Sequence, residues 1–317
     1  GNIYAAPYTS GVANVPVNAM CDYTGLTDLL PREQRNSIMV KLEQQLSERL
    51  TANADIVYSD RQNKQRTSRG SVTATIFGPG NTARASQINP FFSGVPGNAA
   101  TSETVRWNAD GLLGPGAHID TGERSIFANA AVEYKINENW RANAQFVVGD
   151  NTSRQLIIGQ ICGSCAYLAL NGTTNGSGSL TAVSIPGTSI IALNTPLTAA
   201  NALDVFNVTG NRTSAEVLAK LTDSTQSYIA HHTIRDAKFS VSGTLFALPA
   251  GDVKLAVGGE SINYSLTQDI TRPLGIGPSS LGSSATNLSY KRDVKSAYVE
   301  LLVPVVSPEQ NIPFVRR

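Results

Sequence analysis

The chain has 317 residues, with 25 lysine and arginine residues against 24 aspartate and glutamate residues and a formal net charge of +1. This balance excludes a strongly basic surface, so no nucleic-acid partner is expected. Charged residues make up 15% of the chain, below the roughly 25% of an ordinary soluble domain. No apolar run approaches the roughly 20 residues of a membrane-spanning helix.

Seven segments alternate apolar and polar residues with a period of two, which is typical of β-strands whose two faces meet different surroundings. Six of these segments form pairs joined by a tight turn, and long polar stretches separate the pairs. The three hairpins and the single strand are expected at about 36–60, 125–149, 236–266 and 290–303.

In the first hairpin, Ile38 and Val40 alternate with Ser37 and Lys41, and Met39 is an exception on the polar side. The second strand of this hairpin continues the alternation. A turn is expected between the two strands, near residues 47–48.

The second hairpin repeats this design. Ile126 and Ala128 begin its apolar side, and Phe127 is an exception on the polar side. Tyr134 and Trp140 flank the expected turn on the apolar side. Aromatic girdles at the interface levels of a membrane barrel occupy such positions.

In the third hairpin, Phe239 and Val241 alternate with Lys238 and Ser240. The turn is expected at 248–251, Leu-Pro-Ala-Gly, because proline fixes φ and glycine permits positive φ. The seventh strand follows a further polar stretch and ends at a proline.

The connections are long, and loops of this length are uncommon in compact domains unless they are functional or disordered. They are expected at about 1–35, 62–123, 151–235 and 267–288. One helix is expected in the third connection, because Thr213 and Glu216 have the spacing of a capping box.

Strands of about ten residues, tight turns and long loops together predict an all-β fold. The expected architecture is part of a large transmembrane antiparallel β-barrel, with about seven strands, short periplasmic turns and long extracellular loops. Residues 1–317 are expected to form one partial barrel domain. A low mean hydropathy fits this fold, because only every second residue of a barrel strand faces lipid.

Two segments resemble the barrel of proteobacterial TonB-dependent receptors. The first is 236–260, which ends in Leu-Pro-Ala-Gly-Asp-Val-Lys-Leu-Ala-Val-Gly-Gly-Glu, and the second is Tyr-Lys-Arg-Asp-Val-Lys-Ser-Ala-Tyr-Val-Glu-Leu-Leu-Val-Pro-Val from position 290. In that family a strand of the second type is followed by proline, a short turn and another strand. The similarity is specific over about 236–317 and only architectural over 36–150.

This resemblance implies a barrel of about 22 strands in the bacterial outer membrane, with an N-terminal plug domain and energy supplied through TonB. The sequence has no plug-like stretch and no TonB box, so it is expected to be a central barrel fragment. Its implied partners are outer-membrane lipid and lipopolysaccharide, the remaining barrel and plug segments of the same receptor, and TonB through the missing plug region. The transported solute is a scarce one, and siderophore, carbohydrate, peptide and vitamin all remain open.

Two other functions remain open. A passive porin would share the barrel, although porins usually have shorter strand-and-loop units and charged constriction rings. A secreted structural or adhesive β protein would share the strands, but both of their faces would avoid lipid.

The motif Cys162-Gly-Ser-Cys165 predicts a structural disulfide in an extracellular loop, where such a bond persists. A metal site and a redox pair are the alternatives. Zinc needs further ligands, and the context does not resemble thioredoxin. Cys21 is left over and is expected to pair with a cysteine outside this chain.

Charged residues on the polar side of the strands form a candidate lumen-facing set. The functional interpretation is a wall that lines a solute path, and the alternative is a mixed-charge lumen that contacts a plug through ion pairs and water. The set comprises Lys41, Glu43, Asp55, Glu133, Arg141, Lys238, Lys254, Glu260 and Glu300.

Aromatic residues in the connections are candidates for binding the rings of a solute, and the alternative is a small core that holds a loop together. These ligand-binding candidates are Phe91, Phe92, Trp107, Tyr167 and Tyr228. A basic run at the end of the second strand could meet lipopolysaccharide phosphates or could simply be a solvated strand end. It comprises Arg61, Lys64, Arg66 and Arg69.

No motif for catalysis is present. The sequence has no G-x-S-x-G, H-E-x-x-H or EF-hand pattern, and its glycine-rich turns lack the lysine and serine or threonine of a phosphate loop. No pair of the lumen-facing residues has a spacing that argues for acid–base catalysis. The chain is therefore expected not to be an enzyme and to hold no catalytic residues, metal or cofactor.

Overall fold

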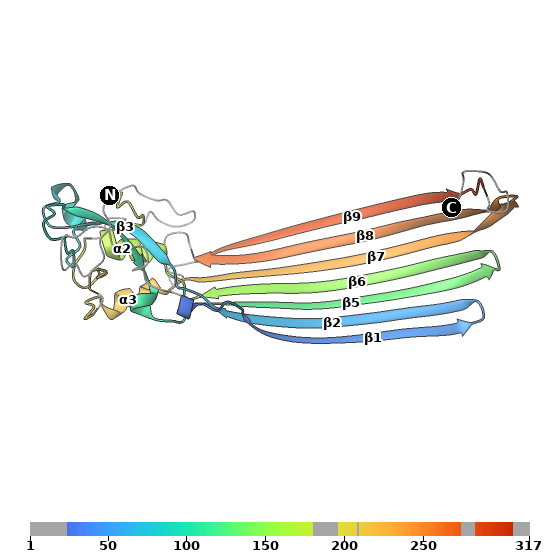
Figure 1. The fold of residues 1–317 in the computed structure, drawn as a ribbon, viewed down its shortest axis with the longest axis horizontal. Coiled ribbons are helices and arrows are strands. Elements are labelled where there is room, and N and C mark those ends of the chain that lie inside the picture. Colours follow the sequence, from blue (N-terminus) through green and yellow to red (C-terminus); the bar gives the residue numbers. More distant parts are fainter. Residues whose placement is uncertain (1–23, 180–195, 208, 274–282, 307–317) are drawn as a thin grey trace.

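The structure is a computed structural model that describes residues 24–179, 196–207, 209–273 and 283–306. It consists of a long seven-stranded antiparallel sheet with a smaller subdomain at one end (Figure 1). The strands of the sheet, in spatial order, are β1 (Arg32–Ser47), β2 (Leu50–Arg66), β5 (His118–Asn137), β6 (Trp140–Ile158), β7 (Thr225–Leu248), β8 (Gly251–Pro273) and β9 (Ser283–Leu302).

The sheet confirms the seven predicted strands and the all-β class. Every strand pairs with the next strand of the sheet in antiparallel register, so the order in space follows the order in the chain. The three hairpin turns are the tight ones expected, at residues 48–49, 138–139 and 249–250. Each hairpin also has a register shift just before or after its turn region.

The strands are longer than the alternation predicts. Strand β2 continues to Arg66, β5 begins at His118, β6 continues to Ile158 and β7 begins at Thr225. Residues at both ends of the connections predicted at 62–123 and 151–235 therefore belong to the sheet. The predicted loop at 267–288 is also shorter than expected, because its first residues belong to β8 and its last residues to β9. Cys21, with the rest of 1–23, and residues 274–282 lie outside the described residues.

The two longest connections fold together into one loop subdomain, made of residues 67–117 and the described part of 159–224 (Figure 1). The sequence predicted a single helix here, and the structure adds a hairpin and further helical turns. The elements are β3 (Ser71–Phe77), η3 (Thr82–Gln87), β4 (Ser102–Asn108), α1 (Asp110–Leu113), α2 (Gly163–Asn171) and α3 (Ala215–Leu221).

The loop subdomain has its own apolar core. Ile76 on β3, Leu170 on α2, Leu221 on α3 and Leu203 in the segment before α3 are 0–1% exposed. These residues come from both connections, so neither connection could bury its apolar side chains without the other. The β3–β4 hairpin supplies one side of the core, because alternate β3 side chains are buried.

Helix α3 confirms the predicted helix but corrects its start. The N-cap is Ser214, whose hydroxyl accepts a hydrogen bond from the Val217 backbone N–H at 3.3 Å. The predicted capping box began one residue earlier, at Thr213. Glu216 instead pairs with Lys220 at 2.7 Å, one turn further along the helix.

Arg69 ties together the three segments of the loop subdomain that adjoin β2, β5 and β6. Its guanidinium donates hydrogen bonds to the carbonyl oxygens of Gly114 (2.7 Å), Pro115 (3.1 Å) and Gly159 (2.7 Å). These acceptors lie just before β5 and just after β6, while Arg69 itself follows β2. A Cβ at Gly116, where φ is 146°, would lie 2.6 Å from the guanidinium, so glycine is needed there.

Candidate functional site

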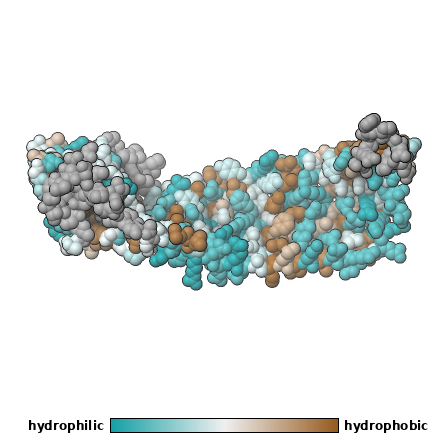
Figure 2. Space-filling view, viewed as in Figure 1, coloured by the Kyte–Doolittle hydropathy of each residue, from teal (hydrophilic) through white to brown (hydrophobic). Residues whose placement is uncertain are grey.

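One face of the sheet carries an apolar band next to the turns. The register places Val40, Ala54, Val132 and Phe239 on this face together with their alternate neighbours. Its large side chains are exposed: Val40 is 58% exposed and Phe239 is 55% exposed. Figure 2, which shows one face of the molecule, has brown side chains among teal ones along the long sheet.

The apolar band has nearly the same length on neighbouring strands. It covers residues 38–46 on β1, 50–58 on β2, 126–134 on β5 and 140–148 on β6. Nine residues extend about 26 Å along a strand, and a tilted strand needs about 9–11 residues to cross a bilayer. The length of the band therefore matches the thickness of a membrane.

The apolar band also runs obliquely across the strands. One row of register partners begins apolar and ends polar: Tyr58, Ile126, Asp150, Thr233, Ser265 and Lys291. The edge of the band moves toward the turns by about one residue per strand, which corresponds to a strand tilt of roughly 35° if the band lies level. Barrel strands tilt by about this amount.

The opposite face of the sheet is polar at the same level. The register places every member of the predicted lumen-facing set on this one face. Asn129 donates to Asp55 at 2.9 Å, and Gln145 donates to Asn129 at 2.8 Å. These bonds link β2, β5 and β6, while the side chains next to Gln145 on β6, Ala144 and Phe146, belong to the apolar band.

A second polar group continues this face across β7, β8 and β9. Lys238 forms ion pairs with Glu260 at 2.8 Å and with Asp236 at 3.2 Å, and Ser296 donates to Glu260 at 3.3 Å. On β5 and β6, the charged residues Glu133 and Arg141 approach to 3.5 Å. The two faces thus have opposite character along the same stretch of strand.

The polar face is interrupted by one apolar row. Its register partners are Met39, Val57, Phe127, Gly149, Ile234, Tyr264 and Arg292. This row borders a hollow of about 380 Å³, which we call the aromatic hollow, lined on this face by Phe127, Ile234, Tyr264, Leu266, Tyr290, His232 and Arg292. The sequence showed Met39 and Phe127 as exceptions to alternation, but it did not show that they share a row.

A second hollow of about 360 Å³ lies closer to the loop subdomain on the same face. Its lining is mainly polar and includes Arg61, Asn63, Glu123, Gln155 and Tyr228. Arg61 is held by Glu33 at 2.8 Å. This hollow therefore has a more polar lining than the aromatic hollow, which lies closer to the hairpin turns.

Of the predicted ligand-binding aromatics, four lie in the loop subdomain and one on the sheet. Phe92, Trp107 and Tyr167 pack against the core of the subdomain, and Phe91 is 6% exposed beneath the Arg212 guanidinium, 4.6 Å from its ring centre. Tyr228 lies on β7, where it lines the second hollow. Phe92, Trp107 and Tyr167 are therefore packed as the alternative prediction expected, in a small core that holds a loop together.

The predicted basic run does not form a free cationic patch. Arg66 pairs with Asp28 at 2.7 Å, Lys64 lies 3.9 Å from Asp120, and Arg69 is buried. The hydrogen bond from the Arg66 side chain lowers the pKa of the Asp28 carboxyl.

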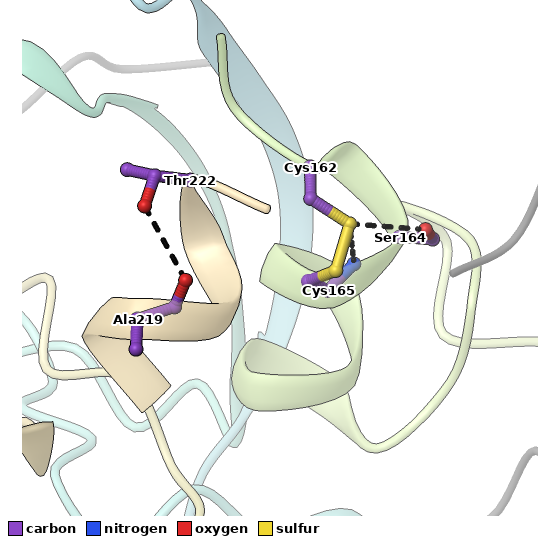
Figure 3. Close-up of a disulfide and its surroundings, with 5 residues drawn as sticks. All are labelled: Cys162, Ser164, Cys165, Ala219 and Thr222. Atoms are coloured by element: carbon purple, nitrogen blue, oxygen red, sulfur yellow. Dashed lines mark hydrogen bonds between the residues drawn. A yellow bond between two sulfur atoms is a disulfide. The ribbon is translucent and has the colours of Figure 1, made fainter. Parts of the chain in front are cut away.

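The Cys162–Cys165 disulfide is formed and caps α2 (Figure 3). The Cys162 sulfur accepts a hydrogen bond from the Cys165 backbone N–H at 3.3 Å, as an N-cap side chain does. The Cys162 backbone N–H donates to the Leu221 carbonyl at 2.8 Å, which ties the start of α2 to the end of α3. A disulfide indicates folding in an oxidising compartment.

Asp204 organises the segment that leads to α3. Its buried carboxylate accepts hydrogen bonds from the backbone N–H of Phe206 and the side chains of Asn207 and Arg212, the last at 2.8 Å. Burial alone would raise the pKa of Asp204, but the bonds from Arg212, Asn207 and Phe206 outweigh it, and the pKa lies below the ordinary value.

No group of three or more His, Cys, Asp and Glu side chains among the described residues could hold a metal ion. None of the described helices has the length and apolar character needed to cross a membrane. Comparison of the chain with protein-family models, with curated proteins and with solved structures found no match.

Proposed function

We propose that this chain is the central barrel segment of a TonB-dependent outer-membrane transporter that takes up a scarce solute. The observation that carries the proposal is the opposite character of the two sheet faces. An apolar band of membrane length lies on one face, and hydrogen-bonded polar side chains lie directly behind it on the other. Lipid outside and water inside would favour this arrangement.

The loop subdomain and the oxidised cysteines also support this proposal. All connections that build the subdomain leave the sheet at the end opposite the tight turns (Figure 1). Long extracellular loops and short periplasmic turns have this asymmetry in outer-membrane barrels. The assignment to the TonB-dependent class rests on the resemblance of residues 236–317 to the barrels of these receptors. It does not specify the transported solute.

The two tryptophans of the chain allow a fluorescence test of whether the apolar band contacts lipid. Trp140 lies at the turn end of the apolar band, while Trp107 packs in the loop subdomain. In vesicles made with brominated lipids, we expect quenching of Trp140 fluorescence in a Trp107→Phe variant. The matched Trp140→Phe variant, which reports Trp107, should be quenched far less.

Equal quenching of the two variants, or none in either, would contradict the membrane proposal and favour the secreted β protein. A second measurement separates active from passive transport. Solute uptake by cells that carry the receptor should stop when TonB is removed. Uptake that persists without TonB would indicate the porin.

A further inference from the structure

The aromatic hollow has features that the sheet itself does not need. Phe127 is 42% exposed, Tyr264 is 41% exposed and Tyr290 is 56% exposed, although they lie on the polar face. Leaving three large rings accessible on a water-facing wall forgoes the stabilisation that burial would give them. Such a set of exposed aromatics with a few polar groups is typical of a binding site.

Small size at one position shapes the hollow. Gly149 lies between Phe127 and Ile234 in the apolar row. A Cβ at Gly149 would lie 2.6 Å from the Ile234 side chain and 3.7 Å from the Phe127 ring. Both side chains therefore lean over the glycine and form an apolar floor between β5 and β7.

Arg292 is the charged side chain that lines the hollow on the polar face. Arg292 stands beside Tyr264 in the same row, and His232 stands opposite Leu266 in the next row. Among the described residues, the side chains of Arg292 and His232 have no hydrogen-bond or ion-pair partner. The acid Asp150, which also borders the hollow, pairs with His231 at 3.3 Å on the other face.

The acids that share the polar face near the hollow already have partners. Glu123 accepts a hydrogen bond from Asn151 at 2.9 Å, and Asp236 and Glu260 both pair with Lys238. A cation in the hollow would therefore meet no free carboxylate among the described residues, whereas an anion would meet an unpaired guanidinium. Arginine binds carboxylates through two parallel hydrogen bonds, which makes it selective for a planar anion.

We propose that the aromatic hollow binds a small solute that combines a flat apolar ring with one carboxylate. The ring lies against Phe127, Tyr264 and Tyr290, and the carboxylate meets Arg292. This inference rests on the proposed function, since it names the chemistry of the solute that the polar face would handle. A segment of polypeptide that covers the hollow is a different occupant, and the experiment separates the two.

The test uses the full chain in lipid nanodiscs and three small probes: benzoate, its uncharged isostere benzamide, and acetate, which has no ring. Binding is followed by ligand-observed NMR titration. Benzoate should bind at least about tenfold more tightly than benzamide, because only the anion forms charge-assisted hydrogen bonds with Arg292. Acetate should bind far more weakly than benzoate.

Two variants locate the binding. Arg292→Gln should weaken benzoate binding about tenfold and leave benzamide binding unchanged, because only the charge contact is lost. The matched control Arg141→Gln removes an arginine from the same face, outside the hollow, and should change neither. Phe127→Leu should weaken benzoate and benzamide alike.

Equal affinity for benzoate and benzamide, or an unchanged affinity in Arg292→Gln, would overturn the inference. Absence of benzoate binding would do so as well, and would favour a polypeptide cover. The quenching of Trp140 by brominated lipid does not depend on the hollow. Quenching without benzoate binding would therefore reject this inference alone, and loss of quenching would reject the proposed function.

Discussion

The sheet and the loop subdomain treat their apolar residues in opposite ways. In the loop subdomain, Ile76 and Leu203 are 0% exposed, and the buried carboxylate of Asp204 accepts hydrogen bonds from Phe206 and Arg212. In the sheet, Val40 and Val299 are 58% and 73% exposed. The subdomain buries its apolar side chains within the chain, whereas the sheet leaves many of its own exposed.

This difference separates two sources of stability. The subdomain gains its stability from contacts within the chain, so it should hold in water and in lipid alike. Under the proposed function the sheet would gain part of its stability from lipid, since burying an exposed apolar side chain is favourable only once it leaves water. Trp107 and Trp140 report the two regions separately, one in each.

The largest expected effect is in the subdomain core. Leu203→Ala should lower the free energy of unfolding of the loop subdomain by about 2–5 kcal/mol, because it leaves a cavity in a fully buried site. Urea unfolding followed by Trp107 fluorescence, in a Trp140→Phe background, measures it. The same substitution at Leu29, which is 98% exposed, should have little effect. A similar loss at both positions would show that the subdomain has no specific core.

A charge in the apolar band should come next. Ala144→Arg should destabilise the sheet in lipid vesicles by about 2–4 kcal/mol, because under the proposed function the new cation lies at mid-membrane depth. The matched control is Asn143→Arg, one residue away on the polar face and opposite Glu133. Unfolding is followed by Trp140 fluorescence in a Trp107→Phe background. Equal effects of the two substitutions would remove the distinction between the faces.

Loss of the disulfide should have a smaller effect, confined to the subdomain. Replacing Cys162 and Cys165 together by serine should lower its free energy of unfolding by about 2 kcal/mol, since the bond closes only a short loop. The Trp107 transition should move to lower urea while the Trp140 transition stays in place. A shift of both transitions would show that the two regions unfold as one.

The smallest expected effect depends on pH. The pKa of Asp204 is lower in the folded than in the unfolded state. Its contribution to the free energy of unfolding is therefore fully present above the unfolded pKa, about 3.9. It is lost as the pH falls through the lower folded pKa. The urea concentration at the midpoint of the Trp107 transition should therefore fall in acid. The Asp204→Asn variant should show a smaller change of this midpoint with pH. If the Asp204→Asn variant shows the same pH dependence, other carboxylates are its cause.

The alternation of residues was enough to predict the seven strands, their tight turns and the two faces. It was not enough to predict where the strands end. In β2, for example, Gln62 and Asn63 are polar on both faces, so the period of two disappears although pairing continues to Arg66. Alternation reports a difference between surroundings, and it stops where both sides meet water.

The aromatic hollow shows a second limit. Met39 and Phe127 were visible as exceptions, but their alignment with Ile234 and Tyr264 depends on which strands pair across connections of tens of residues. That pairing comes from the register of the whole sheet. Strand β3, in contrast, could have been predicted from the local sequence, because Val72 and its neighbours alternate. The glycine-rich residues around this short segment made the alternation easy to miss.

Arg69 gives the molecule a mechanical property. Its side chain holds the chain just before β5 and just after β6, and its own backbone continues from β2. Any twisting or spreading of these three strand ends must either break a hydrogen bond to the guanidinium or carry the attached residues along. Movement at this rim of the sheet is thereby coupled to the adjoining segments of the subdomain by this side chain.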